Sequence, residues 1–241
     1  MIPMGSAPST VGRVSMASNG STASPAGFAG FHPDALEFFD GLGADNSKSY
    51  WNDQRETYER SARGPMSAML AELADEFGSA KIFRPYRDVR FSADKSPYKD
   101  HLGAFTGPSP TREGTGSGYY VQLSANGLYA GGGRYTFDRD ALARYRAAVD
   151  NEHTGRPLTV IVADLVASGL DVGGASLVRA PRGFDPDHPR IDLLRHKGLH
   201  AGRLFTVDDW LFTAEAKDRV AATWRELTPL NAWFDTHLDG I

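Results

Sequence analysis

Five cationic side chains and two carboxylates fall within 16 residues, from Arg84 to Lys99. The cations are Arg84, Arg87, Arg90, Lys95 and Lys99, and the carboxylates are those of Asp88 and Asp94. The segment carries 5 − 2 = +3, whereas the whole chain carries −4. A positive segment in a negative chain favours an anionic ligand, because guanidinium groups donate paired hydrogen bonds to phosphate or carboxylate oxygens. The pattern predicts a small-molecule site for an anion, which could be enzymatic.

Each residue of this segment has an expected role. The predicted ligand-binding residues are Arg84, Arg87, Asp88, Arg90, Lys95, Tyr98 and Lys99. Asp88 would orient an arginine, and Asp94 or Tyr98 could donate or accept a proton. Asp94-Lys95-Ser96-Pro97 has the composition of a turn, because proline fixes the backbone and the aspartate can bond to it.

Two other interpretations fit the same residues. In the first, Asp88 and Asp94 pair with the arginines, and the chain is a non-catalytic interaction or scaffold domain. In the second, the interleaved aromatic residues Tyr86, Phe91 and Tyr98 stack on the bases of a single-stranded nucleic acid. The net negative charge and the shortness of the basic segment argue against nucleic acid.

Secondary candidates lie elsewhere in the chain. Arg134 follows the glycine run 131–133, and Arg179 and Arg182 lie in a segment rich in proline and charge. The glycine run could bind phosphate at a helix N-terminus, but it lacks the GxGxxG pattern and a Walker lysine. We therefore expect it to mark a close backbone approach instead.

Metal and cofactor chemistry has little support in the sequence. The candidate metal ligands are His188, His196 and His200, but their spacing matches no known ligand motif. Cysteine is absent, which excludes disulfides and thiolate ligands. We predict no metal and assign no cofactor.

The charged segment also carries a recognisable signature. It reads Arg-x-x-Arg-Asp-x-Arg-Phe-x-x-Asp-Lys-x-x-Tyr from Arg84 to Tyr98. This run resembles the signature of a bacterial family of conserved hypothetical proteins, domain of unknown function 2461. Similar stretches are 31–58, with Asn46 and Trp51, and 119–133 and 181–189. The resemblance extends from about Phe28 to the C-terminus; it implies an α+β domain and supplies no catalytic residues.

Several elements must position these residues. Apolar spacing predicts helices near 33–42, 47–63, 66–77, 138–149, 157–166, 189–196 and 208–227, with a last amphipathic stripe over 230–238. Gly64-Pro65 should interrupt the second helix. Strands are predicted at 82–91, 119–123, 128–130, 176–179 and 204–207, with a hairpin at Asn126-Gly127 and a long loop from Gly107 to Gly118. The fold class is α+β: a single domain with an antiparallel, hairpin-containing sheet flanked by N- and C-terminal amphipathic helices.

Length and composition set the remaining expectations. The chain has 241 residues, 41% of them hydrophobic and 23% charged, which is ordinary for a globular protein. The most apolar stretch, 158–170, contains Asp164 and is shorter than the ~20 residues of a membrane span, so we predict a cytoplasmic protein. Residues 1–27, rich in Gly, Ala and Ser, should be a disordered leader before the domain 28–241. The sequence leaves Met1 or Met16 as the start and leaves the oligomeric state open.

Overall fold

The computed structural model describes residues 27–90, 93–107 and 116–239. The predicted leader 1–27 lies outside these residues except for its last position, and so does most of the predicted loop from Gly107 to Gly118. The α-helices described are α1 (Asp34–Ala44), α2 (Lys48–Tyr58), α3 (Gly64–Phe77), α4 (Arg139–Asp150), α5 (Glu152–Ala167), α6 (Ile191–Arg195) and α7 (Glu215–Phe234). The π-helical segments η1 (Glu59–Arg63) and η3 (Asp235–Asp239) and the 3-10 helix η2 (Asp209–Phe212) complete the helical elements described.

The described strands form one antiparallel sheet in the order β1-β2-β3-β4-β6-β5. They are β1 (Ala80–Ile82), β2 (His101–Thr106), β3 (Gly118–Ser124), β4 (Gly127–Arg134), β5 (Asp171–Gly173) and β6 (Leu199–Phe205). The predicted hairpin is confirmed, but its two-residue loop is Ala125-Asn126, one residue earlier than predicted, because Gly127 already pairs with Ser124. Gly127 has a φ of 120° that favours glycine.

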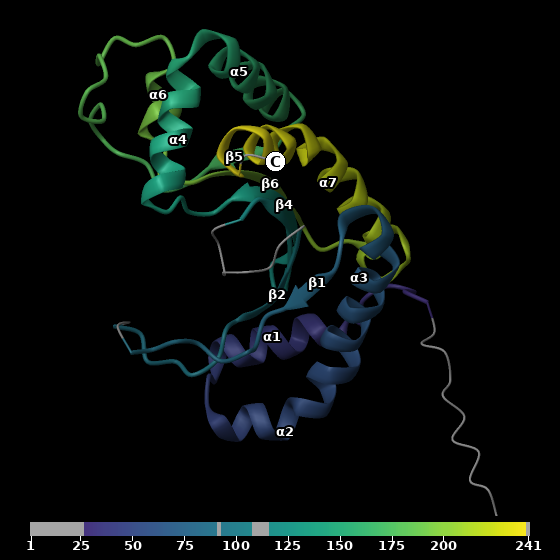
Figure 1. The fold of residues 1–241 in the computed structure, drawn as a ribbon. Coiled ribbons are helices and arrows are strands. Elements are labelled where there is room, and N and C mark those ends of the chain that lie inside the picture. The colour runs from purple at the N-terminus through teal and green to yellow at the C-terminus, as the bar shows by residue number, and fades with distance from the viewer. Residues whose placement is uncertain (1–26, 91–92, 108–115, 240–241) are drawn as a thin grey trace, which may run out of the picture.

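Helices cover one face of this sheet and both of its ends. The helix α7 lies against β3 and β4, and the buried indole N–H of Trp224 donates to the carbonyl of Tyr120 at 3.1 Å. The N-terminal helices α1–α3 lie at the β1 end, and α4–α6 lie at the opposite end (Figure 1). One core joins both groups to the sheet, which confirms the predicted single α+β domain.

The predicted break at Gly64-Pro65 is wrong. The helical path continues from α2 through η1 into α3, and the Gly64 N–H donates to the carbonyl of Glu59 in the wider π turn. Pro65 lies in the first turn of α3, where a missing N–H and a fixed φ are tolerated. Gly-Pro commonly ends a helix, and the π turn that accommodates it here has no simple sequence signature.

Other element boundaries also differ from the prediction. Residues 176–179 form a single bridge, between Ser176 and His196, in place of a strand. The last strand is β6, at 199–205 instead of 204–207, because pairing with both β4 and β5 overrides its weak local propensity. Asp208 caps the short η2, and the long helix α7 begins only at Glu215.

The glycine run 131–133 lies inside β4, as a close-approach interpretation predicts. A Cβ at Gly131 would lie 2.7 Å from the Tyr129 hydroxyl and 2.8 Å from the Ala201 carbonyl oxygen. The helix after it, α4, begins at Arg139, and the Asp138 side chain caps its first N–H groups. The run therefore serves strand packing and does not open a phosphate-binding helix.

Among the helices of the described residues, none combines the length and apolar character that a membrane span requires.

Candidate functional site

The charged segment forms a projecting arm, defined here as residues 83–90 and 93–100 between β1 and β2 (Figure 1). The Arg87 N–H donates to the Pro97 carbonyl at 2.9 Å, and the Lys99 N–H donates to the Pro85 carbonyl at 2.8 Å. These bonds join the two sides of the arm as an irregular antiparallel pair. The predicted strand over 82–91 is therefore mostly wrong, since only β1, which ends at Ile82, is regular.

The base of the arm is fixed to α2 by stacked aromatic rings. The Tyr98 ring lies parallel to the Trp51 indole, with centroids 4.5 Å apart and an interplanar angle of 10°. The Tyr86 ring contacts both of them, at 5.2 Å from Tyr98 and 6.4 Å from Trp51. Tyr98 and Trp51 are buried, whereas Tyr86 is 51% exposed. The arm therefore presents Tyr86 to the outside on a rigid support.

Asn46 holds the same base through its side-chain amide. Its Nδ2 donates to the Tyr98 carbonyl at 3.1 Å, and its Oδ1 accepts from the Tyr98 N–H at 3.0 Å. A single side chain thus satisfies both backbone groups of a buried residue, which would otherwise be costly.

Internal ion pairs hold the tip of the arm. The Arg90 guanidinium donates from Nε and Nη2 to the two oxygens of Asp88, at 2.9 and 2.6 Å. These bonds lower the pKa of Asp88 to about 2. Arg90 is still 76% exposed, so the pair lies in solvent. The Lys95 ammonium donates to the Val89 carbonyl at 2.9 Å.

A second ion pair joins the two sides of the arm. The Asp94 carboxylate accepts from the hydroxyl and N–H of Ser96, at 2.6 and 2.9 Å, and from the Arg87 guanidinium. The pKa of Asp94 is therefore lowered, first by Ser96 and then by Arg87. Asp94 closes the turn that its sequence predicts.

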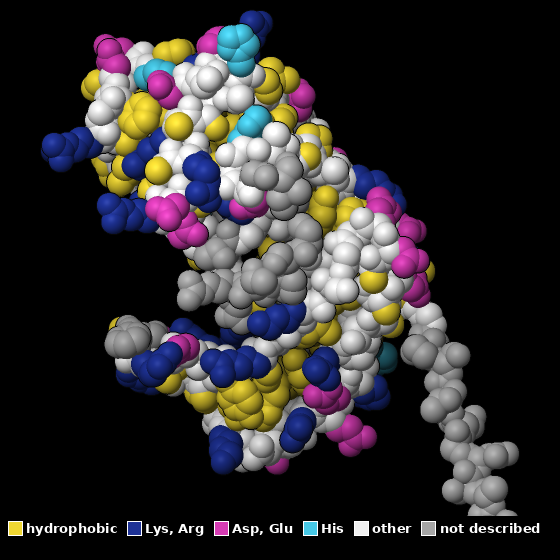
Figure 2. All heavy atoms as spheres, in the orientation of Figure 1, with side chains coloured by type: hydrophobic (Ala, Val, Ile, Leu, Met, Phe, Trp, Pro, Cys, Tyr) yellow, Lys and Arg dark blue, Asp and Glu magenta, His cyan; other side chains and the backbone are white. Residues whose placement is uncertain are grey.

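A groove lies on one side of the arm, and we name it the outer groove. It has a volume of about 410 Å³ and is lined by Trp51, Arg55, Tyr58, Glu59, Arg63, Ile82, Phe83, Arg84, Pro85 and Tyr86. Three of these side chains are cationic and one is anionic, which gives 3 − 1 = +2. In the region of α2 and the arm, Figure 2 shows hydrophobic side chains bordered by Lys and Arg.

Two guanidinium groups of the outer groove lack a partner within the described part of the chain. The side chains of Arg55 and Arg84 make no hydrogen bond or ion pair there. Arg84 does act on Asp88 through its charge and contributes to the low pKa of that carboxyl. Arg63 pairs with Glu59 at 3.3 Å, and both side chains are about half exposed, so this pair is weak.

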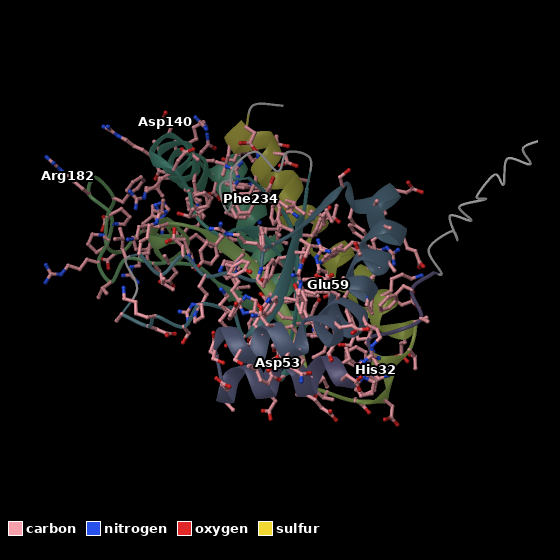
Figure 3. The ribbon with its side chains drawn as sticks, turned by 90° about the horizontal axis from the view of Figure 1, so that it is seen from below. His32, Asp53, Glu59, Asp140, Arg182 and Phe234 are labelled. Atoms are coloured by element: carbon pink, nitrogen blue, oxygen red, sulfur yellow. The ribbon has the colours of Figure 1, made fainter. Side chains whose placement is uncertain are left out.

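The π segment η1 supplies two residues of the outer groove, Glu59 and Arg63. Its i→i+5 bond adds one residue to the turn between α2 and α3. Such single π turns are frequent at functional sites. Figure 3, seen from below, labels Glu59 at this junction.

A second hollow, the inner pocket, lies beside the arm and also measures about 410 Å³. It is lined by Gly43, Asn46, Arg87, Asp94, Ser96, Tyr98, Lys99, Asp100 and His101. Two cations face two carboxylates here, and His101 Nδ1 lies 2.8 Å from Asp100. The charges cancel, so this pocket suits an anion less well than the outer groove does.

The predicted ligand-binding residues, together with Asp94, which was predicted to donate or accept a proton, are thus divided among three places. Arg84 lines the outer groove; Arg87, Asp94, Tyr98 and Lys99 line the inner pocket; Asp88, Arg90 and Lys95 form the tip. Lys99 also lies over the Phe83 ring, 5.2 Å from its centroid.

The secondary candidates do not join the arm. Arg134 is buried in β4 and donates to both carboxylate oxygens of Asp239, at 2.6 and 2.5 Å. Arg179 and Arg182 are exposed on the segment between β5 and α6. In Figure 3 the Arg182 side chain points away from the molecule, far from Glu59.

The candidate metal ligands differ in their contacts. His188 Nε2 lies 3.3 Å from Asp150, and His200 stacks on Tyr135 at 5.8 Å. Burial lowers the pKa of His196 and of His200. Over residues 27–90, 93–107 and 116–239, no group of three or more His, Asp or Glu is arranged to hold a metal ion.

Arg55 and Arg63 are absent from the predicted site, although the structure places both in the outer groove with Arg84. For Arg55 a signal existed: Trp51, Arg55 and Tyr58 are spaced i, i+4 and i+7 and so share one face of a helix. For Arg63 none existed, because its position depends on the π turn.

Comparison with known proteins identifies one family model that matches most of the chain. A search of curated proteins finds no match. The model of the family described as conserved hypothetical protein (DUF2461) matches residues 34–233, from the start of α1 to nearly the end of α7. The matched region, 233 − 34 + 1 = 200 of 241 residues, includes the arm and the outer groove. The chain therefore belongs to the DUF2461 family of conserved hypothetical proteins.

Proposed function

We propose that this protein binds a small molecule through a phosphate or carboxylate group held in the outer groove. The observation that carries the proposal is the gathering of Arg55, Arg63 and Arg84 around one hollow that holds a single carboxylate. Arginine recognises such oxygens through a planar fork of donors, which keeps its charge when partly buried.

The charge distribution of the chain supports this assignment. The groove carries +2 within a chain of −4, so the remaining residues carry −6. An isolated positive hollow attracts anions at a distance, and the attraction falls as salt rises. Arg55 and Arg84 can turn toward a ligand without breaking an ion pair in the described chain.

The paired arginines of the arm have a supporting role in this proposal. Arg87 with Asp94 and Arg90 with Asp88 fold the tip, and the ring stack fixes the base. The arm then holds Arg84 and Tyr86 at the wall of the groove. Arg87 and Lys99 remain candidates for ligand contacts from the inner pocket.

Thermal unfolding with added anions tests the proposal. At a concentration 100-fold above Kd, phosphate, a nucleotide or a dicarboxylate should stabilise the protein by about 2.7 kcal/mol. Replacement of Arg84 by Ala should abolish the shift, whereas Arg182→Ala, at an exposed position far from the groove, should retain it. If none of these anions shifts the Tm of the wild-type protein, the proposal is wrong.

The internal ion pairs favour a second candidate, a non-catalytic interaction domain whose arginines serve only the fold. The two candidates differ in the behaviour of Arg84, which has no ion pair to lose in the described chain. If the second candidate is correct, anions should shift the Tm of neither the wild-type protein nor Arg84→Ala, and Arg84→Ala should be as stable as the wild type.

A further inference from the structure

We infer that the ligand of the outer groove carries its anionic group on a planar ring, as an aryl phosphate or a nucleoside monophosphate does. This inference rests on the proposed function and specifies its ligand class. It starts from the rings in the groove, since four of its ten lining residues are aromatic: Trp51, Tyr58, Phe83 and Tyr86.

These rings differ sharply in exposure. Trp51 and Tyr58 are 5% and 2% exposed and form the floor, with their centroids 5.0 Å apart. Tyr86 is 51% exposed although Trp51 and Tyr98 both contact its ring. One part of the Tyr86 ring is thus fixed by protein, and the remainder is open to the groove and to solvent.

A fixed, exposed ring is an effective platform for stacking. Its rotamer is already restricted by the rings behind it, so a ligand ring that covers it loses little side-chain entropy. Arg84, two residues before Tyr86, lines the same groove. A ring over Tyr86 would therefore lie close to the guanidinium groups that would hold its anionic substituent.

An inorganic anion alone would leave this surface unused. Phosphate can satisfy the arginines, but it covers no aromatic surface, and a groove of about 410 Å³ exceeds what one tetrahedral anion fills. Stacking on an aromatic side chain and burial of a ligand ring both strengthen binding, by about tenfold or more per ring.

Isothermal titration calorimetry of the full-length protein with inorganic phosphate, phenyl phosphate and phenol tests the inference. Phenyl phosphate should bind at least tenfold more tightly than phosphate, and phenol at least tenfold more weakly than phenyl phosphate. In Tyr86→Ala the ratio of the affinity for phenyl phosphate to the affinity for phosphate should fall below about threefold, while in Tyr86→Phe it should return to the wild-type value. Tyr135→Ala, at a 73% exposed ring just after β4, is the matched control and should keep the wild-type ratio of the two affinities.

The outcomes separate this inference from the proposed function. Equal affinities for phosphate and phenyl phosphate would overturn the inference and leave anion binding intact. No binding of either would overturn both. An unchanged ratio of the two affinities in Tyr86→Ala would also overturn the inference. Binding of decathymidylate more than tenfold more tightly than thymidine monophosphate would overturn it too, because it would indicate a nucleic-acid surface.

Discussion

At the scale of single residues, Asp88 shows how the arm uses its charges. The guanidinium of Arg90 first, and then its backbone N–H, lower the pKa of Asp88 from 3.8 to about 2. Because the pKa is lower in the folded arm than in an unfolded chain, this ion pair favours the folded arm above about pH 4 and is lost as the pH falls through 2. In Arg90→Ala the pKa of Asp88 should return toward 3.8, as measured by carboxyl ¹³C NMR titration.

The control for this titration is Asp138. Its pKa is lowered chiefly by the N–H of Ala141 at the start of α4, so Arg90→Ala should leave it unchanged. A pKa of Asp88 that stays near 2 without Arg90 would contradict the role given to this pair.

Asn46 is the residue on which the base of the arm depends. Replacement of Asn46 by Ala leaves the N–H and carbonyl of the buried Tyr98 without their partner. The loss should lower the free energy of unfolding by about 1–3 kcal/mol, measured by urea denaturation. Asn52→Ala, at an exposed position of α2, should change it by less than about 0.5 kcal/mol. Equal effects would show that Asn46 has no special role.

Single residues also mark the limit of what the sequence predicts. The run from Arg84 to Lys99 locates the arm, and Asp94 forms the turn expected of it. The sequence could not separate Arg84 from Arg90, because ion-paired and partnerless arginines look alike when their neighbours in space are unknown. Arg55 and Arg63 approach Arg84 only once α2, η1 and the arm are folded together.

At the scale of elements, periodicity was informative where one face of an element is buried. The helix with Met66, Met69, Leu70 and Leu73 is confirmed as α3, and the hairpin of β3 and β4 is confirmed. The arm and β6 were less predictable. The arm takes its shape from rings and ion pairs, and β6 from its partners β4 and β5.

Thr106 joins two of these elements, β2 and α3. Its hydroxyl, buried between them, donates to the Phe77 carbonyl at 2.7 Å and lies 2.8 Å from the Gly78 carbonyl oxygen. Thr106→Val keeps the shape of the side chain but removes the hydroxyl that donates to the carbonyls at the end of α3, so the free energy of unfolding should fall by about 1–3 kcal/mol. Thr206→Val, at an exposed position after β6, is the control and should have little effect. If Thr106→Val is as stable as the wild type in thermal or urea denaturation, this hydrogen bond does not stabilise the contact between β2 and α3.

At the scale of the whole molecule, the C-terminal segment η3 closes the fold against β4. Arg134 is 4% exposed, and Asp239 supplies its carboxylate partner. The Ser117 hydroxyl also donates to Asp235 in η3. Asp239→Asn would leave a buried guanidinium without its counter-charge and should cost about 3 kcal/mol of stability, measured by urea denaturation. The control is Asp187→Asn, on the exposed segment before α6, which should leave the free energy of unfolding unchanged. If Asp239→Asn also leaves it unchanged, η3 does not stabilise the fold through this ion pair.

The whole molecule also explains why the arm can form a binding site. The arm extends from the sheet near α2 (Figure 1), and residues of α2, η1 and the arm line the outer groove. A ligand in the groove would therefore contact α2, η1 and the arm at once. Binding should couple these elements without involving α4–α6, which lie at the opposite end of the sheet.

The most direct measurement is an NMR titration of the arginine Nε–Hε signals with phenyl phosphate. We predict that the signals of Arg55, Arg63 and Arg84 shift together along one saturable curve, while the signal of Arg182 stays in place. Saturation should require more ligand at high salt. If the three signals do not move, or if all exposed arginines shift alike without saturation, the outer groove is not an anion-binding site.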